Sequence, residues 1–231
     1  MGSPETVQDG STRTGSWRVY EPLQLDRILT AALDGFAEQG FHGTSVRDIA
    51  SRVGVTLPSL YYHYTNKQGM LAALLLNAVE ETYERTTQAL AEADGDPVVE
   101  LSNLVQCVAL RMTARTKMAA LTAELRFLGQ EDQDRYHDWR IRVENRFLAT
   151  LQRGAKSGVF LVDDVHITAR AHLDMVRSIA RWHQGGTQKD NEKLAMSYAL
   201  LALRSVGVDI TAQDLERATA AAAARSGGVL P

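Results

Sequence analysis

The sequence has one cysteine, few aromatic residues, no excess of either charge sign and no long apolar run. The single Cys107 excludes an internal disulfide framework and is typical of proteins from a reducing compartment. The longest uninterrupted apolar run, Met70–Leu76, is far shorter than the ~20 residues that a membrane-spanning helix needs. Residues 1–16 lack the apolar segment of a secretory signal. These absences predict a cytoplasmic globular protein.

Sequence motifs of common enzyme classes are missing as well. The chain has no P-loop, no Gly-x-Gly-x-x-Gly and no Gly-x-Ser-x-Gly. His137, His166, His172 and His183 never stand four residues apart on one predicted helix, so the sequence has no pair of histidines spaced to bind zinc from one helix. Cys107 lies in an apolar run with no cation beside it, as expected for a core thiol rather than a nucleophile. We therefore expect no enzyme activity, no metal and no cofactor.

Apolar residues recur with helical spacing along most of the chain, which predicts an all-α fold. Gly40, Gly54 and the stretch Asp94–Pro97 stand where helices should end. The expected helices run from Pro22 to Gly40, from Thr44 to Gly54, from Thr56 to Tyr64 and from Asn66 to Ala93, and then over residues 97–115, 116–128, 131–156, 164–182, 190–206 and 212–224.

Two short predicted helices joined by Gly54-Val55-Thr56 have the length and the turn of a helix-turn-helix motif. In the second of them, Leu60 and Tyr64 would point inward because they stand four residues apart. The outward or sideways positions are then Leu57, Ser59, Tyr61, Tyr62 and His63. Such rings are unusual on a solvated surface, whereas Tyr hydroxyls and imidazoles bind phosphates and rings pack on thymine methyl groups. The alternative is that the tyrosines pack against the following helix.

The charge around this motif is positive although the whole chain carries −3. Residues 41–67 hold three basic residues, Arg47, Arg52 and Lys67, against the single acid Asp48. Lys67 would begin the next helix, where its ammonium can reach a phosphate at the flank of the motif. A small local basic surface of this kind favours a nucleic-acid partner.

The segment from Thr44 to Lys67 resembles the DNA-binding domain of the TetR family of repressors. The likeness rests on a helix that starts at Thr or Ser and contains Ile-Ala, then Gly-Val, Leu-Tyr-x-His-aromatic and Lys, all at the family's spacing. It covers residues 22–70, whereas the C-terminal two-thirds match only in helix count and layout. The resemblance implies phosphate contacts by Thr44, Arg47, Tyr61, His63 and Lys67 and base contacts by Leu57, Ser59 and Tyr62. Thr56, a residue type that caps helices, is a further candidate DNA-binding residue at the start of the second helix.

The resemblance also implies a domain organisation and a mode of action. Residues 1–20 would be a flexible arm, 21–67 the helix-turn-helix domain, 68–210 a ligand-binding and dimerisation domain, and 211–231 a C-terminal helix with a frayed tail. A homodimer would bind a palindromic double-stranded operator, and a small ligand in the C-terminal domain would release it. The helix from residue 67 to 93 would be the only covalent link between the two domains.

The predicted helix over residues 190–206 has more apolar residues than one buried face requires. Ten of its seventeen residues are apolar, whereas a helix packed on one side needs about three in seven. Together with residues 164–182 it is expected to form a four-helix interface between two subunits. The alternative is a central core helix of a monomer.

Helices between residues 97 and 182 carry large side chains that could surround a ligand cavity. The segment Arg181-Trp182-His183-Gln184-Gly185-Gly186 is similar to a stretch of TetR-type regulators of fatty-acid or sterol catabolism, with His183 in place of a Tyr. This similarity implies a lipid-like or acyl-CoA effector. The candidate ligand-binding residues are Met112, Phe127, Trp139, Arg140, Phe147, Met175 and Arg177.

An alternative function is an all-helical enzyme or carrier with an internal apolar cavity. Its only support is the acidic run Glu131-Asp132-Gln133-Asp134, which resembles an aspartate-rich metal motif of helical synthases. The same run is typical of a helix N-terminus, where acids interact favourably with the helix dipole.

Overall fold

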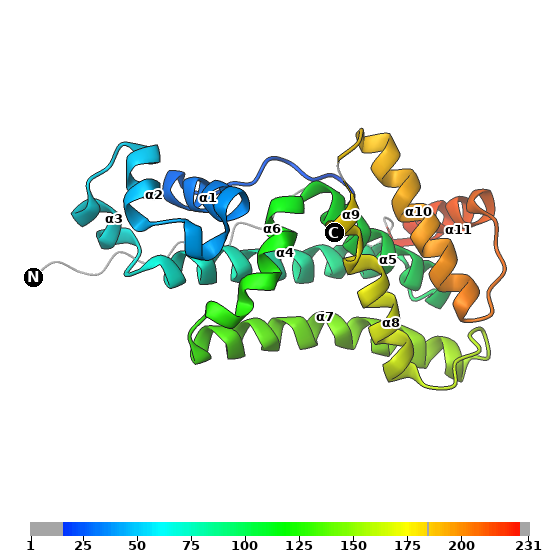
Figure 1. The fold of residues 1–231 in the computed structure, drawn as a ribbon. Coiled ribbons are helices and arrows are strands. Elements are labelled where there is room, and N and C mark those ends of the chain that lie inside the picture. Colours follow the sequence, from blue (N-terminus) through cyan, green and yellow to red (C-terminus); the bar gives the residue numbers. More distant parts are fainter. Residues whose placement is uncertain (1–15, 184, 227–231) are drawn as a thin grey trace, which may run out of the picture.

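The computed structural model describes residues 16–183 and 185–226, which form helices joined by short loops (Figure 1). The elements are α1 (Arg27–Gly43), α2 (Val46–Val53), α3 (Leu57–His63), α4 (Lys67–Glu92), α5 (Pro97–Ala114), α6 (Thr116–Ala120), the 3-10 helix η1 (Leu121–Phe127), α7 (Gln130–Lys156), α8 (Val165–Arg177), α9 (Ile179–Trp182), α10 (Gln188–Ser205) and α11 (Ala212–Ser226). No strand occurs in this part of the chain, so the all-α prediction is confirmed. None of the helices within these ranges combines the length and apolarity needed to cross a membrane.

Side-chain caps explain where the N-terminal helices begin. Asp26 accepts a hydrogen bond from the backbone N–H of Leu29 at the start of α1, and Thr56 accepts one from Ser59 at the start of α3. Helix α2 begins one residue later than predicted, because Ser45 rather than Thr44 forms the cap. Each such cap is worth about 1 kcal/mol to its helix.

Two predicted helices are each broken in the structure. The segment 116–128 divides into α6 and η1, and the segment 164–182 divides into α8 and α9. Near the two breaks, the hydroxyls of Thr122 and Ser178 donate to carbonyls three residues earlier, at 2.7 Å in both cases. Such bonds compete with the regular helical ladder, and periodicity of apolar residues does not reveal them.

Helix α4 joins two hydrophobic cores. Its first half, with Met70 and Leu74, packs with α1, α2, α3, α6 and η1 in the core of the helix-turn-helix end. Its second half, with Ala89, belongs to a larger core built on α5, α7, α8 and α10. The view in Figure 1 shows α4 running between these two parts. A boundary at residue 67 or 68 therefore divides the chain at the start of a helix that both parts share.

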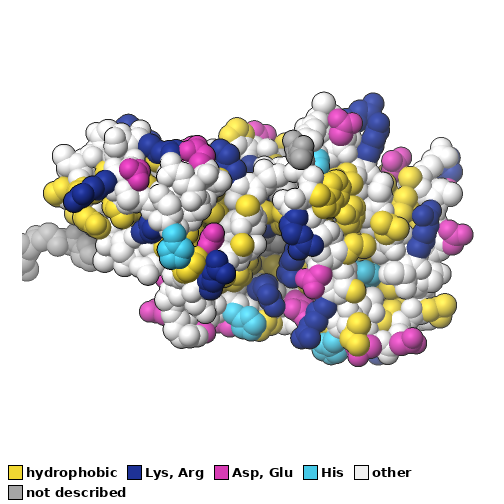
Figure 2. Space-filling view, viewed as in Figure 1, with side chains coloured by type: hydrophobic (Ala, Val, Ile, Leu, Met, Phe, Trp, Pro, Cys, Tyr) yellow, Lys and Arg dark blue, Asp and Glu magenta, His cyan; other side chains and the backbone are white. Residues whose placement is uncertain are grey.

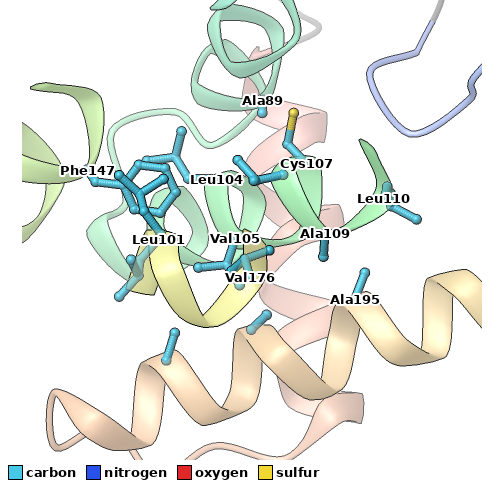
Figure 3. Packing of buried hydrophobic residues seen from close by; sticks show 14 of the residues in the cluster. Ala89, Leu101, Leu104, Val105, Cys107, Ala109, Leu110, Phe147, Val176 and Ala195 are labelled. Atoms are coloured by element: carbon cyan, nitrogen blue, oxygen red, sulfur yellow. The ribbon is translucent and has the colours of Figure 1, made fainter. Parts of the chain in front are cut away.

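Small side chains bring α10 close to α5 in the larger core. Ala195, Ala199 and Ala202 are at most 1% exposed and lie on the α5 side of α10. Figure 3 shows Ala195 pointing at α5, which presents Ala109 and Val105. Leu203 of α10 is also fully buried in this core, whereas Leu201 is 51% exposed.

Residues 16–20 fall within the stretch expected to be a flexible arm, but they are packed against the larger core. Trp17 is only 2% exposed, and the Tyr20 hydroxyl donates to the carbonyl of Cys107 at 3.2 Å. Residues 1–15 of the expected arm and 227–231 of the expected tail lie outside the described residues. The described part of α11 continues to Ser226, and Ala222 within it is fully buried.

His172 on α8 makes the stability of the fold depend on pH. It is 3% exposed, its Nε2 lies 2.7 Å from Ser205 Oγ, and burial lowers its pKa to about 4. The unfolded chain takes up this proton near pH 6.5, so protonation favours unfolding below that value. We expect the free energy of unfolding to fall by about 2 kcal/mol between pH 7.5 and pH 5 through this group.

Urea unfolding at both pH values measures this loss. A His172→Gln variant keeps a hydrogen-bonding side chain and should lack this part of the pH dependence, whatever its stability at pH 7.5. The exposed His166 provides the matched control, because His166→Gln should leave the pH dependence unchanged. Equal pH dependence of His172→Gln and the parent protein would contradict the prediction.

Candidate DNA-binding and ligand-binding sites

The helix-turn-helix motif is fixed by a left-handed turn and a shared apolar contact. Gly54 has φ 70°, a conformation that glycine adopts without strain, and its N–H satisfies the last carbonyls of α2. Leu60 of α3 is fully buried with Ile49 and Val53 of α2 in one core. The packing of these residues leaves the opposite face of α3 toward solvent.

The outward face of α3 carries most of the residues predicted for it. Tyr62 is 86% exposed and Tyr61 49%, and Ser59 and His63 are also exposed. The rings of Tyr62 and His63 meet edge to face with centroids 5.2 Å apart. Among the tyrosines, Tyr64 is the one that turns inward, as predicted.

Tyr64 connects α3 to α1. Its hydroxyl donates to Asp26 Oδ2, while the other oxygen of Asp26 caps α1. Burial, and then the carboxylate of Asp26, raise the pKa of Tyr64. Leu57, predicted to lie outward or sideways, is half-buried against the core.

Thr44 and Lys67 make hydrogen bonds within the protein, which the sequence did not predict. Thr44 is 1% exposed and its hydroxyl donates to the carbonyl of Gly40. Lys67 Nζ donates to the carbonyls of Phe41 at 2.6 Å and Thr44 at 2.8 Å, and lies 4.4 Å from the Phe41 ring centroid. The ammonium thus satisfies carbonyls that the end of α1 leaves without helical partners. Arg47 at the start of α2 is exposed and remains a candidate for phosphate contact.

A cavity of about 630 Å³ lies between α4, α5, α6, η1, α7, α8 and α9. Three of the predicted ligand-binding residues line it: Met112, Arg140 and Arg177. The other four do not line it. Phe127 stacks on Phe41 with centroids 5.1 Å apart, Trp139 lies against Tyr83 at 5.1 Å, Phe147 is fully buried in the larger core, and Met175 packs at the edge of that core.

The cavity wall carries four arginines and one acid. Arg111, Arg140, Arg177 and Arg181 line it together with Asp174, which leaves an excess of positive charge. Figure 2 shows basic side chains gathered around a hollow in the middle of this face, over the region where Figure 1 places α6, α8 and α9. This arrangement attracts an anion.

One arginine of the cavity wall has an unpaired nitrogen, and another, which pairs with Asp174 at 3.5 Å, has a lowered pKa. Arg111 is 7% exposed, and its buried Nε has no hydrogen-bond partner among the described residues. Burial, followed by the charge of Arg140, lowers the pKa of Arg177. Arg111 is not among the predicted lining residues, although a charge within the apolar run around Cys107 was the available signal.

The acidic run lies at the first turn of α7, as its helix-terminus interpretation predicts. Asp132 forms an exposed ion pair with Arg135 at 3.3 Å, and Gln130 donates to Asp134 at 2.9 Å. Residues 16–183 and 185–226 contain no group of three His, Cys, Asp or Glu side chains arranged to hold a metal ion. The structure therefore offers no support for a catalytic role of this run.

Comparisons with known proteins agree with this architecture. Residues 28–74 match the family of bacterial regulatory proteins called tetR, and residues 94–206 match the tetracycline repressor-like C-terminal domain. The HTH-type transcriptional repressor KstR2 of Mycolicibacterium smegmatis is 26% identical over 184 residues, which are 78% of this chain and 89% of that protein.

Solved structures give the same result over most of the chain. A regulatory protein of the tetR family from Rhodococcus RHA1 has a TM-score of 0.72 and 27% identity, covering 80% of this chain and 97% of that one. The TetR-family regulator PfmR from Thermus thermophilus has a TM-score of 0.68 and 28% identity, with the same coverage of 80% and 97%. Because both of its parts match this family and its fold matches solved members, the chain belongs to the tetR family of bacterial regulatory proteins.

Proposed function

We propose that the protein is a transcriptional repressor that binds a palindromic operator as a homodimer and is released by a small anionic ligand. The observation that carries the DNA-binding role is the outward face of α3, where Tyr62 is 86% exposed on a helix held rigidly by Leu60. A helix of this size enters the major groove, which is about 12 Å wide. Arg47, Ser59 and His63 are exposed nearby and would add phosphate and base contacts. A role on chromosomal DNA corresponds to a location in the bacterial cytoplasm.

The dimer is supported by apolar side chains that the single chain leaves in contact with water. Ile167 on α8 is 68% exposed, Trp182 on α9 is 51% exposed and Leu201 on α10 is 51% exposed. We call these residues, with the half-buried Leu194, Met196 and Leu200, the α8–α10 face. A second subunit with the same face would cover it through a two-fold axis.

The ligand class follows from the charged and apolar residues that line the cavity. Four arginines and one acid, with apolar residues such as Val79, Met112 and Leu125, suit a molecule with an anionic group and an apolar part. An acyl-CoA or a lipid acid meets both requirements, whereas an uncharged lipid would leave the arginines without partners.

The cavity shares a wall with the DNA-binding domain, which supports release by a ligand. Ala119, Ala120 and Leu125 of α6 and η1 line the cavity. The same segment contacts α1 through an ion pair of 2.7 Å between Lys117 and Asp34 and through the stacked ring of Phe127. A ligand that moves this segment or α4 would change the separation of the two α3 helices, which successive major grooves require to be about 34–36 Å.

The test of DNA binding uses the face of α3. A Tyr61→Ala/Tyr62→Ala variant should bind an operator, selected from random DNA with the parent protein, at least tenfold more weakly, since base contacts are worth roughly 1–3 kcal/mol each. Fluorescence anisotropy at several salt concentrations measures the affinity, and the salt slope should stay near that of the parent because the two tyrosine side chains carry no charge.

A Lys67→Met variant serves as the structural comparison. It should lower the thermal unfolding midpoint because the carbonyls of Phe41 and Thr44 lose their donor, whereas the tyrosine variant should keep the parental midpoint. A parent protein that selects no sequence from random DNA would overturn the proposal and favour a carrier that uses the cavity alone.

A further inference from the structure

Residues 17–26, here called the N-terminal strap, are held firmly on the larger core at one end. Arg85 of α4 donates to the carbonyls of Trp17 at 3.2 Å and Val19 at 2.9 Å. The indole of Trp17 is 2% exposed and donates to Glu92 at 2.6 Å, and Arg18 pairs with the same carboxylate. Arg85 and Glu92, which both lie in the second half of α4, therefore hold this segment.

A buried charge network continues the attachment toward α5. Arg115 donates to the carbonyl of Glu21 at 2.6 Å and pairs with Glu81 at 3.3 Å, while Glu81 also pairs with Arg85 at 3.2 Å. Tyr20 lies beneath the two guanidinium groups, with Arg85 3.8 Å from its ring centroid. Breaking a buried network of this kind leaves unpaired charges, so the attachment is strong.

The other end of the strap is part of the DNA-binding domain. Asp26 caps α1 through one carboxylate oxygen and accepts the Tyr64 hydroxyl of α3 with the other. Only Pro22–Leu25 lie between the two attachments; they have no helical structure, and Leu23 and Leu25 pack against the core. Figure 1 shows the strap in dark blue, crossing from the α9 and α10 side of the molecule to α1.

The attachment adjoins the wall of the ligand cavity. Glu81 is followed along α4 by Thr82, and Cys107 along α5 by Val108, and both Thr82 and Val108 line the cavity. Arg111, which also lines it, stands one helical turn before Arg115. A ligand that displaces α4 relative to α5 would therefore move the residues that hold the strap.

We propose that the strap is a second mechanical link between the ligand-binding domain and α1–α3, acting in parallel with α4. Helix α4 is the only covalent link expected between the two domains, and the strap adds a non-covalent attachment beside it. One link alone permits rotation about its axis, whereas two separated links fix the orientation of α3. The contribution of the strap to operator binding and release rests on the proposed function, but the link itself does not.

The test gives the strap slack without removing any of its contacts. Three glycines inserted between Gln24 and Leu25 lengthen the free segment, and the same insertion between Val162 and Asp163 is the matched control. Spin labels on Gln39→Cys in α1 and Gln152→Cys in α7 report the distance between the domains, since both positions are exposed and Cys107 is fully buried. Labelled chains are diluted with unlabelled protein so that each distance is measured within one subunit.

We expect the distance distribution of the strap insertion to be about twice as wide as that of the parent, because a glycine-rich segment is flexible. The control insertion should leave the width unchanged. A Trp17→Ala variant releases the other end of the strap and should broaden the distribution in the same way. Parental widths for both strap variants would overturn the link.

The affinity for the operator measures the functional consequence of the link, independently of the distance between the domains. The strap insertion should bind the selected operator about tenfold more weakly than the control insertion. Its α3 helices are less ordered before binding, so they lose more entropy when they bind. A parent that binds no operator would refute the proposed function while leaving the distance result intact. Equal operator affinities with a broadened distribution would show that the strap does not orient α3, which would overturn its functional role.

Discussion

A Leu201→Asp variant is expected to sediment as a monomer and to bind operator at least about 100-fold more weakly than the parent. Leu201 is 51% exposed in the C-terminal half of α10, and the proposed two-fold interface would bury it. Two carboxylates would then be taken out of water without partners, which costs several kcal/mol. The operator effect follows because a monomer binds each half-site independently and loses the effective concentration of the second site.

Sedimentation velocity at micromolar concentration and anisotropy titration measure the two effects. The matched control is Ile141→Asp, because Ile141 is 39% exposed on α7, outside the α8–α10 face. This control should remain a dimer with parental operator affinity. A monomeric parent, or a Leu201→Asp protein that remains dimeric, would refute the assignment of the interface.

An Arg140→Met/Arg177→Met variant should bind palmitoyl-CoA about 100-fold more weakly, because hydrogen bonds to charged groups are worth roughly 1.5–3 kcal/mol each. The same variant should be more stable than the parent when no ligand is present. Burial and the charge of Arg140 both disfavour the charged form of Arg177, so removing both charges relieves a cost that the parent bears without an anion. Weaker binding combined with a higher unfolding midpoint distinguishes a binding role from a structural one.

Titration calorimetry and thermal unfolding measure the two effects. The matched control is Arg135→Met/Arg217→Met, which removes two charges from exposed positions outside the cavity. It should change neither the affinity for palmitoyl-CoA nor the unfolding midpoint. A parent that binds an uncharged long-chain alcohol but not palmitoyl-CoA would show that the arginines do not select the ligand.

Local backbone chemistry made the helix-turn-helix motif predictable from the sequence. The turn requires a residue such as Gly54 with positive φ, and the four-residue spacing of Leu60 and Tyr64 determines which face of α3 is buried. The exposure of Tyr61 and Tyr62 follows from these two facts alone. Helix periodicity is a property of neighbouring residues, so a single sequence displays it.

The surroundings of other residues could not be predicted, because contacts between distant parts of the chain determine them. Lys67 has a long, charged side chain at a helix start, and only the position of the Phe41 and Thr44 carbonyls shows that it binds inside the protein. Phe147, predicted to bind the ligand, is fully buried in the larger core, because a cavity is the space that packing leaves empty and periodicity does not locate it. The polar composition of residues 1–20 predicted a flexible arm and gave no sign that Trp17 packs in the core. The presence of an indole in such a segment was the available signal.

On α10, the residues that contact α5 are not the residue that is exposed for the proposed partner. The choice of partner can therefore evolve without changing the fold. Ala195, Ala199 and Ala202 must stay small because α5 lies against them, whereas the exposed Leu201 can be exchanged without disturbing that contact. After a gene duplication, two copies could therefore become unable to form mixed dimers through changes on one outward surface. Each paralogue would keep its operator-reading helix and its cavity intact. Regulatory circuits with separate inputs could arise from this scaffold by few substitutions.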